Sequence, residues 1–253
     1  MAAHSKAKIR LGQLGFIVVL LLVLEITVRA GLISVLIVSS PSAIAVKVWQ
    51  DLGSGELWSS LQTTAVEFGI GFLISLTLGV VFGVVFFRFR HFGSAVEPLL
   101  LAFYAAPTIL LYPVFLTLFG LGSATVVTMA VVFGSIPIMV NVSVGLAGVE
   151  PIFIKLGRSL KATRWQMFSK IMLPAATPTI FTGLRLGFTY TLVGVIAVEF
   201  ITFSGGLGKM VSWRYFLFDT EGIFSGIVFV ILIAVLMNGL LRRTEERIRK
   251  RWT

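Results

Sequence analysis

The sequence predicts an all-α integral membrane protein with six transmembrane helices and one folded cytoplasmic insertion. The chain has 253 residues, of which 57% are hydrophobic, and its mean hydropathy is +1.00. Only 13% of the residues are charged, whereas a soluble domain carries about 25%. Apolar runs long enough to cross a bilayer, at about 20 residues each, alternate with short basic segments.

The positions of the basic residues predict how these helices are oriented. The formal net charge is +10, and most of the 21 Lys and Arg residues flank apolar runs, in the segments 6–10, 88–90, 155–170 and 242–251. Cytoplasmic loops of membrane proteins carry such an excess. We therefore expect both termini and the insertion at 150–173 to be cytoplasmic, and we expect a lipid bilayer but no nucleic acid as a partner.

The chain has few side chains that could bind a metal ion, and none that could act as a thiol. Cysteine is absent, and histidine occurs only at His4 and His91, which are both peripheral. A metal site or a membrane-embedded active site needs several such side chains around one cavity. We therefore expect neither a bound metal nor an enzymatic activity in this chain.

The N-terminal part predicts two spans. The first lies at about 11–38, and Glu25 and Arg29, four residues apart on one helix face, form an expected ion pair near its outer end. Residues 40–62 indicate an external interfacial helix followed by a loop. A second span at 66–87 ends at a pair of arginines.

The middle and C-terminal parts predict four more spans in a single transmembrane domain, 1–253. Residues 98–149 contain no Asp, Glu, Lys, Arg or His, which is too long for one span. A glycine-rich break divides this stretch. The expected spans are 98–119, 124–148, 175–202 and 222–241, with the polar insertion at 150–173 and a polar loop at 204–221.

Small residues and prolines lie inside the expected spans. Gly79/Gly83 and Gly183/Gly187 are spaced for close helix packing. Prolines are expected to kink membrane helices; they lie at Pro107, Pro113, Pro137 and Pro178.

The insertion predicts two short helices. Ile152, Phe153, Leu156 and Leu160 recur at helical spacing, with the basic side chains turned away from them. Thr163 and Gln166 have the spacing of a capping box, which begins a second helix that we expect Leu173 and Pro174 to end. Trp165, Phe168 and Ile171 share one side of it. Two readings stay open: a docking element, and a helix on anionic lipid.

Residues of the insertion and its flanks resemble a known family. The segments 157–166, 171–175 and 182–186 resemble the EAA loop of binding-protein-dependent ABC importer permeases. Further segments, in matching order over residues 12–252, resemble its nitrate/sulfonate/taurine branch: Ser40–Ser42, Gly55–Trp58, Ala106-Pro107 with Pro113, Phe119–Gly122, Val198-Glu199, Gly205–Gly208 and Arg249–Trp252.

The resemblance implies the type I ABC importer permease fold in a bacterial inner membrane. It implies as partners two ABC ATPase subunits, a second permease copy and an external solute-binding protein. The chain lacks a P-loop motif, so ATP and Mg would be used by the ATPase and no cofactor by this chain. The implied ATPase-coupling residues are Phe153, Leu156, Gly157, Arg158, Leu160, Lys161, Ala162, Thr163, Arg164, Trp165, Phe168 and Pro174.

Two residues of the insertion depart from the family pattern. Lys155 begins the triplet where the family has Glu-Ala-Ala, and Lys161 stands where it has glycine. A left-handed conformation at Lys161 would cost about 1–2 kcal/mol. The reversed charge at Lys155 suggests an ATPase face of altered charge, testable with Lys155→Glu.

Polar residues within spans are candidates for the translocation path. They are Tyr104, Thr108 and Tyr112 on one expected face, Asn141, then Thr182, Arg185, Thr189 and Tyr190, and finally Glu199. Arg185 either contacts an anionic substrate or reaches the interface as a structural residue. We expect Glu199 to be a gate or packing residue.

The resemblance implies import of a small anion such as nitrate, a sulfonate or taurine. The same machinery carrying an aromatic acid or a pyrimidine vitamin precursor is the alternative. A stand-alone secondary carrier would predict an inverted repeat and deep acidic residues. No convincing repeat is present, and Glu67 and Glu199 lie near span ends.

Overall fold

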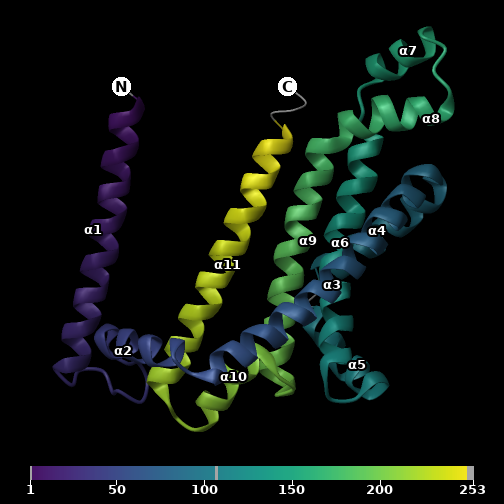
Figure 1. Cartoon of the computed structure of the whole chain (residues 1–253). Helices are drawn as coiled ribbons and strands as arrows, with labels where there is room; N and C mark the ends of the chain where they lie inside the picture. Colours follow the sequence, from purple (N-terminus) through teal and green to yellow (C-terminus); the bar gives the residue numbers. More distant parts are fainter. Residues whose placement is uncertain (1, 106–107, 250–253) are drawn as a thin grey trace.

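The computed structural model describes residues 2–105 and 108–249 (Figure 1). Within these ranges the chain is helical and has no strand. The elements are α1 (Ala2–Arg29), α2 (Pro41–Leu52), α3 (Gly55–Arg88), α4 (Arg90–Ala105), a 3-10 turn (Thr108–Leu111), α5 (Tyr112–Phe119), α6 (Ser123–Ala147), α7 (Pro151–Ser159), α8 (Arg164–Gln166), a π segment (Met167–Met172), α9 (Leu173–Thr202), α10 (Gly206–Phe216) and α11 (Thr220–Arg249).

Four stretches of helix are long and apolar enough to cross a membrane. They are Gly55–Arg88, Ser123–Ala147, Arg164–Phe216 and Thr220–Leu241. The start of α1, the end of α11 and the α7–α8 pair lie at one end of the molecule, whereas α2, α5 and α10 lie at the other (Figure 1). We call these the α7 end and the α10 end. Six crossings and their cytoplasmic side remain predictions from the sequence.

The core forms where α6 packs between α3 and α9. Its buried side chains include Phe68 of α3, Met129 of α6 and Leu192 of α9. Close approach depends on glycine: a Cβ at Gly79 would lie 2.6 Å from Ile138, and a Cβ at Gly187 would also collide with Ile138. The glycines noted in the sequence therefore allow α3 and α9 to pack closely against α6.

Helix α1 ends earlier than the span expected at 11–38. Gly31 has a φ of 72°. The Leu32 amide donates to the Thr27 carbonyl at 3.1 Å, and the Gly31 amide donates to the Val28 carbonyl at 3.0 Å. This is the Schellman pattern that ends a helix. The expected Glu25–Arg29 ion pair is present, and Ser42 at the start of α2 also bonds to Glu25.

Three expected loops or spans differ in the structure. The loop expected after the interfacial helix is instead the first turns of α3, because Ser54 caps that helix at Leu57. The loop expected at 204–221 contains α10. The span expected at 98–119 is broken into α4, the 3-10 turn and α5, with Pro98 inside α4 and Pro113 in the first turn of α5.

Pro174 does not end the second helix of the insertion. Helix α8, the π segment and α9 run on as one helix through Leu173 and Pro174. The Leu173 amide bonds to the carbonyl of Phe168, five residues back. This wider turn changes the backbone register ahead of the proline, whose ring would otherwise clash with the carbonyl four residues back. Pro107 and residues 250–252 lie outside the described residues.

Candidate functional site

The insertion forms a projection at the α7 end, beyond the ends of α6 and α9 (Figure 1). Helix α7 and the short α8 are joined by a turn at residues 160–163. We call residues 151–172 the α7–α8 projection. Its inner side packs on the transmembrane core, and its outer side carries exposed apolar and basic side chains.

Gly157 seats α7 against the π segment. It is buried, and a Cβ there would lie 2.6 Å from both Ile171 Cδ1 and Met167 Cε. Ile154 and Phe168 are half-buried and pack against a cluster that includes Leu146. The projection is therefore attached to α6 and α9 by apolar contacts.

The turn between α7 and α8 has the Schellman geometry. Lys161 has a φ of 52°. Its amide bonds to the Arg158 carbonyl at 3.0 Å, and the Ala162 amide bonds to the Gly157 carbonyl at 3.0 Å. Lys161 thus occupies the left-handed position that glycine normally fills. The conformation considered from the sequence is confirmed, with its cost of about 1–2 kcal/mol.

The expected capping box is present at the start of α8. The Gln166 amide donates to Thr163 Oγ1 at 3.2 Å, and the Thr163 amide donates to Gln166 Oε1 at 2.9 Å. Two amides that the helix start leaves without partners are thereby satisfied. The box fixes the direction in which α8 leaves the turn.

The outer side of the projection is apolar at its centre. Leu156 is 56% exposed and Trp165 is 73% exposed, and Ile152, Phe153 and Leu160 are exposed with them. The projection also carries exposed basic residues: Lys155, Arg158, Lys161, Arg164 and Lys170. Several large apolar side chains exposed on one short element are typical of an interaction site.

The residues expected to couple to an ATPase therefore divide into two groups. Phe153, Leu156, Leu160 and Trp165 are exposed, as are Arg158, Lys161, Thr163 and Arg164. The others are buried or half-buried and shape the projection from inside: Gly157, Ala162, Phe168 and Pro174.

The residues expected along a translocation path are dispersed. Thr108 lies in the 3-10 turn and Tyr112 begins α5, so these two do not share a continuous helix face with residue 104; the side chain of Tyr104 lies outside the described part. That expectation from helical spacing is wrong, because the helix is interrupted.

On α9 the expected residues lie on one continuous helix, but their side chains have different surroundings. Thr182 and Arg185 are exposed, and Tyr190 is 37% exposed. Thr189 donates to Asn238 of α11 at 3.2 Å. Asn141 of α6 bonds within its own helix, to the Pro137 carbonyl at 2.8 Å, and packs against Gly183.

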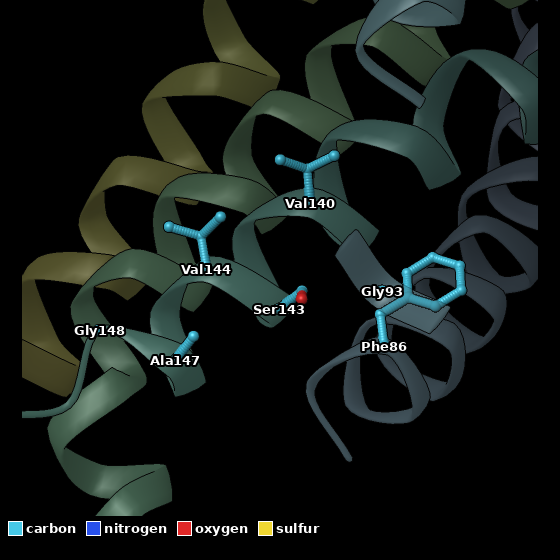
Figure 2. A pocket seen from close by; sticks show the side chains of 7 residues that line it. All are labelled: Phe86, Gly93, Val140, Ser143, Val144, Ala147 and Gly148. Carbon is cyan, nitrogen blue, oxygen red and sulfur yellow. The ribbon is translucent and has the colours of Figure 1, made fainter. Parts of the chain in front are cut away.

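A cavity of about 350 Å³ lies beside the base of the projection. Figure 2 shows Phe86 and Gly93 facing Val140, Ser143 and Val144 of α6, with Gly148 at the end of that helix. The lining is mostly apolar. None of the expected path residues contributes to it.

Two buried polar clusters at the α10 end were not found from the sequence. Arg214 of α10 bonds to both carboxylate oxygens of Asp51, at 2.6 and 3.0 Å, and Ser225 donates to Asp51 at 2.7 Å. Burial alone would raise the pKa of Asp51, but the hydrogen bonds from Arg214 and Ser225 and the Arg214 charge outweigh it and lower that pKa.

The second cluster contains Glu199, which is fully buried in α9. Thr64 of α3 donates to its two oxygens at 2.7 and 2.9 Å, and the Gly208 amide donates to Oε2 at 2.9 Å. Glu199, expected to be a gate or a packing residue, is thus buried between α3 and α10. A charged residue within an expected span was the sequence signal for this cluster, whereas Asp51 and Arg214 lie outside the expected spans and gave no such signal.

Comparisons with known proteins bear on these sites. Residues 75–250 match a family model described as "Binding-protein-dependent transport system inner membrane component". The riboflavin transport system permease protein RibX of Chloroflexus aurantiacus is 30% identical over 85% of this chain and 80% of that protein. SsuC of Bacillus subtilis, an aliphatic sulfonates transport permease, is 26% identical over 87% and 80%. The taurine transport permease TauC of Escherichia coli is 25% identical over 93% and 88%.

A solved structure has the same fold. A chain from a crystal structure of the MetNI methionine ABC transporter in inward facing conformations superposes with a TM-score of 0.58. The match covers 78% of this chain and 94% of that chain, at 22% sequence identity. At this identity the likeness establishes the fold alone.

Proposed function

Because the chain belongs to the family of binding-protein-dependent transport system inner membrane components, we propose that the α7–α8 projection docks onto a separate ATPase subunit and passes its ATP-driven movement to the transmembrane helices. The chain is an inner-membrane permease of an ABC importer and not an enzyme, since in such importers the ATPase is a separate subunit. A substrate-binding protein is the other partner that this family implies.

The exposed apolar centre of the projection carries this proposal. Leu156 and Trp165 are more than half exposed, although the inner side of the same element is firmly packed through Gly157. A lipid-surface helix would also place apolar side chains outward. However, the projection stands beyond the helix ends (Figure 1), and the family supplies a protein partner at a permease's cytoplasmic side. We assign the α7 end to the cytoplasm on the basic residues that flank the spans.

The assembly we propose contains two copies of this permease and two ATPase subunits. Closure of the ATPases on ATP, which they bind with Mg, would push on the two projections. The helices of each copy would then rock between inward-facing and outward-facing states. The external binding protein would deliver the solute at the α10 end.

The first experiment purifies the tagged chain from its native membrane in mild detergent and identifies co-purifying proteins by mass spectrometry. We expect a P-loop ATPase at about one copy per permease. Leu156→Asp should reduce its recovery about ten-fold or more, the effect of losing an interface hot spot. The matched control is Leu217→Asp, which changes an equally exposed leucine at the α10 end and should leave recovery unchanged.

Two outcomes would contradict the docking proposal. One is a wild-type permease reproducibly free of ATPase, and the other is equal recovery with Leu156→Asp and wild type. Lys155→Glu tests the finer idea of charge matching. If that variant stimulates and retains its native ATPase as well as wild type does, the ATPase face does not depend on the charge at Lys155.

For the substrate we propose a small organic or inorganic anion such as nitrate, a sulfonate or taurine. The sulfonate and taurine relatives support this class, whereas the riboflavin relative favours a larger ring compound, the alternative. Arg185 is an exposed cation of α9 and is the residue we propose to attract the anion. Uptake of labelled taurine, nitrate and riboflavin by cells with and without the transporter distinguishes the classes. Arg185→Ala, but not Arg185→Lys, should reduce uptake of an anion.

A further inference from the structure

Two carboxyl groups lie together inside the α10 end. Glu67 of α3 is 2% exposed and Glu199 of α9 is fully buried. Thr64, which lies three residues before Glu67 and on the same face of α3, donates to Glu199, so this face of α3 places Glu67 beside the Glu199 carboxyl group. Among the described residues no ion pair includes either of them. Two buried negative charges without a cation are very costly, so the pair must hold a positive charge or a proton.

Hydrogen-bond donors surround the Glu199 carboxyl group. The Thr64 hydroxyl accepts from the Leu207 amide at 2.9 Å, so its own hydrogen is directed at Glu199. The Gly208 amide, in the first turn of α10, also donates to Glu199. A helix N-terminus favours a negative charge.

Glu67 has the opposite surroundings. Neither of its carboxyl oxygens accepts a hydrogen bond from any donor that the structure describes. A neutral carboxyl has a proton to donate, whereas an ionised one only accepts. One proton shared between the two carboxyl groups would therefore give Glu67 the hydrogen-bond partner that it lacks.

The glycines of the 205–208 segment bring the α10 backbone onto this pair. Gly206 has a φ of 74°, and a Cβ there would collide with the Glu199 carboxyl. A Cβ at Gly208 would lie 2.6 Å from Glu199 Cβ. A cavity of about 570 Å³, lined by Thr63, Gly206 and Lys209 among others, lies on the other side of this thin layer of backbone. Water in that cavity is a ready source of the proton.

We propose that Glu67 and Glu199 form a binding site for one proton, which ties α3, α9 and α10 together at the α10 end. A metal cation fits less well because the donors at Glu199 present hydrogens, not oxygen lone pairs, to whatever lies there. The charged groups near the pair are accounted for: Lys209 is exposed beside the cavity, and Arg214 is paired with Asp51. The proposal depends on neither the substrate nor the ATPase.

Infrared spectroscopy of the full chain in lipid nanodiscs tests the proton itself. We expect a carbonyl-stretch band of a neutral carboxylic acid that persists at neutral pH and shifts in heavy water. Glu67→Gln, which imitates the neutral acid in shape, should remove this band. Glu221→Gln, a change of an exposed acid at the same end, should keep it. Absence of the band from the wild-type chain overturns the proposal, whether or not any variant folds.

Thermal unfolding of the same samples tests the consequence for stability. As pH rises and the pair is forced to ionise, the Tm of the wild type and of Glu221→Gln should fall by several degrees more than that of Glu67→Gln. Glu199→Gln should lower Tm more than Glu67→Gln at neutral pH, because its amide hydrogens face donors. Parallel pH profiles for Glu67→Gln and wild type would overturn the proposal. So would a rise in wild-type Tm with sodium or potassium at fixed pH that Glu67→Gln lacks, since a metal cation would then occupy the site.

Discussion

The α7 end and the α10 end differ in the burial and pairing of their charged side chains. At the α10 end, Arg214 and Asp51 are both buried and bonded to each other. At the α7 end the basic side chains of the projection are exposed, and no ion pair among the described residues involves them. The first arrangement is complete within one chain, whereas the second leaves basic side chains accessible to the ATPase that we propose as partner.

This difference predicts where substitutions change folding and where they change assembly. Removing one member of a buried ion pair leaves an isolated charge in an apolar surrounding. Changing an exposed side chain of the projection, without introducing glycine, alters the free energy of unfolding by about 0.5 kcal/mol or less. The following predictions test that division, beginning with the largest effect.

Asp51→Ala should lower the free energy of unfolding by about 3–5 kcal/mol, since the buried Arg214 loses its two-oxygen partner and keeps only the more exposed carboxylate of Glu56, at 3.3 Å. The measurement is thermal or denaturant unfolding of the full chain in nanodiscs. Lys47→Ala is the control, because Lys47 lies 3.9 Å from the half-exposed Asp219 and such a pair contributes about 0–1 kcal/mol. Equal losses of unfolding free energy in Asp51→Ala and Lys47→Ala would contradict the idea that the buried ion pair stabilises the fold more than the exposed one.

Acid should weaken the same buried pair. The pKa of Asp51 is lower in the folded chain than its ordinary value, so its contribution to stability is present above that ordinary value and is lost as pH falls through the folded one. We expect the Tm of wild type to fall in strong acid more steeply than that of Asp51→Asn. If the Tm of wild type and of Asp51→Asn falls equally steeply in acid, Asp51 does not bind its proton differently in the folded and unfolded states.

Gly157→Leu should destabilise the attachment of the projection by about 1–3 kcal/mol, the usual cost of overpacking. The added side chain meets Met167 and Ile171. Gly239→Leu is the matched control, because nothing lies within 4 Å of a Cβ at that position. We expect only Gly157→Leu to increase proteolysis of the projection and to reduce ATPase recovery. A Gly157→Leu chain that resists protease as wild type does would contradict this packing role.

Lys161→Gly should stabilise the projection slightly, by about 1 kcal/mol, because glycine accepts the left-handed conformation without strain. Lys155→Gly provides the opposite sign: it places glycine inside α7 and should destabilise by about 1 kcal/mol. Hydrogen exchange of the 157–163 amides measures both changes. If Lys161→Gly exchanges faster than wild type, the lysine side chain stabilises the turn more than its backbone strain destabilises it.

Much of the fold follows from hydrophobic patterning. The apolar stretches now in α3, α6, α9 and α11 were visible because lipid excludes charge over about 20 residues. The capping box at Thr163 was visible because it depends on two residues three positions apart. The left-handed conformation at Lys161 was considered only because the family that the chain resembles has glycine there. Helix-capping motifs and apolar membrane spans can therefore both be predicted from a single sequence.

What could not be read from the sequence depends on distant contacts or on balanced local alternatives. Asp51 and Arg214 form an ion pair although they lie 163 positions apart in the sequence. Thr64 donates to Glu199, which lies 135 positions further along the chain. Pro174 was expected to end a helix, but the π register lets the helix continue. The break near Thr108 separates residues whose spacing suggested a shared face. In each case tertiary packing decides between conformations that the local residues allow.

The bend between the π segment and α9 has a mechanical consequence. The helical backbone is unbroken from Arg164 to Thr202, but the short arm formed by α8 and the π segment runs across the start of α9 (Figure 1). Exposed Trp165 lies on this short arm, and buried Glu199 lies near the far end of α9. At 1.5 Å per residue α9 is about 45 Å long. A tilt of α9 by about 5° at the bend would therefore displace its far end by about 4 Å, which is more than the length of the hydrogen bonds between Thr64 and Glu199.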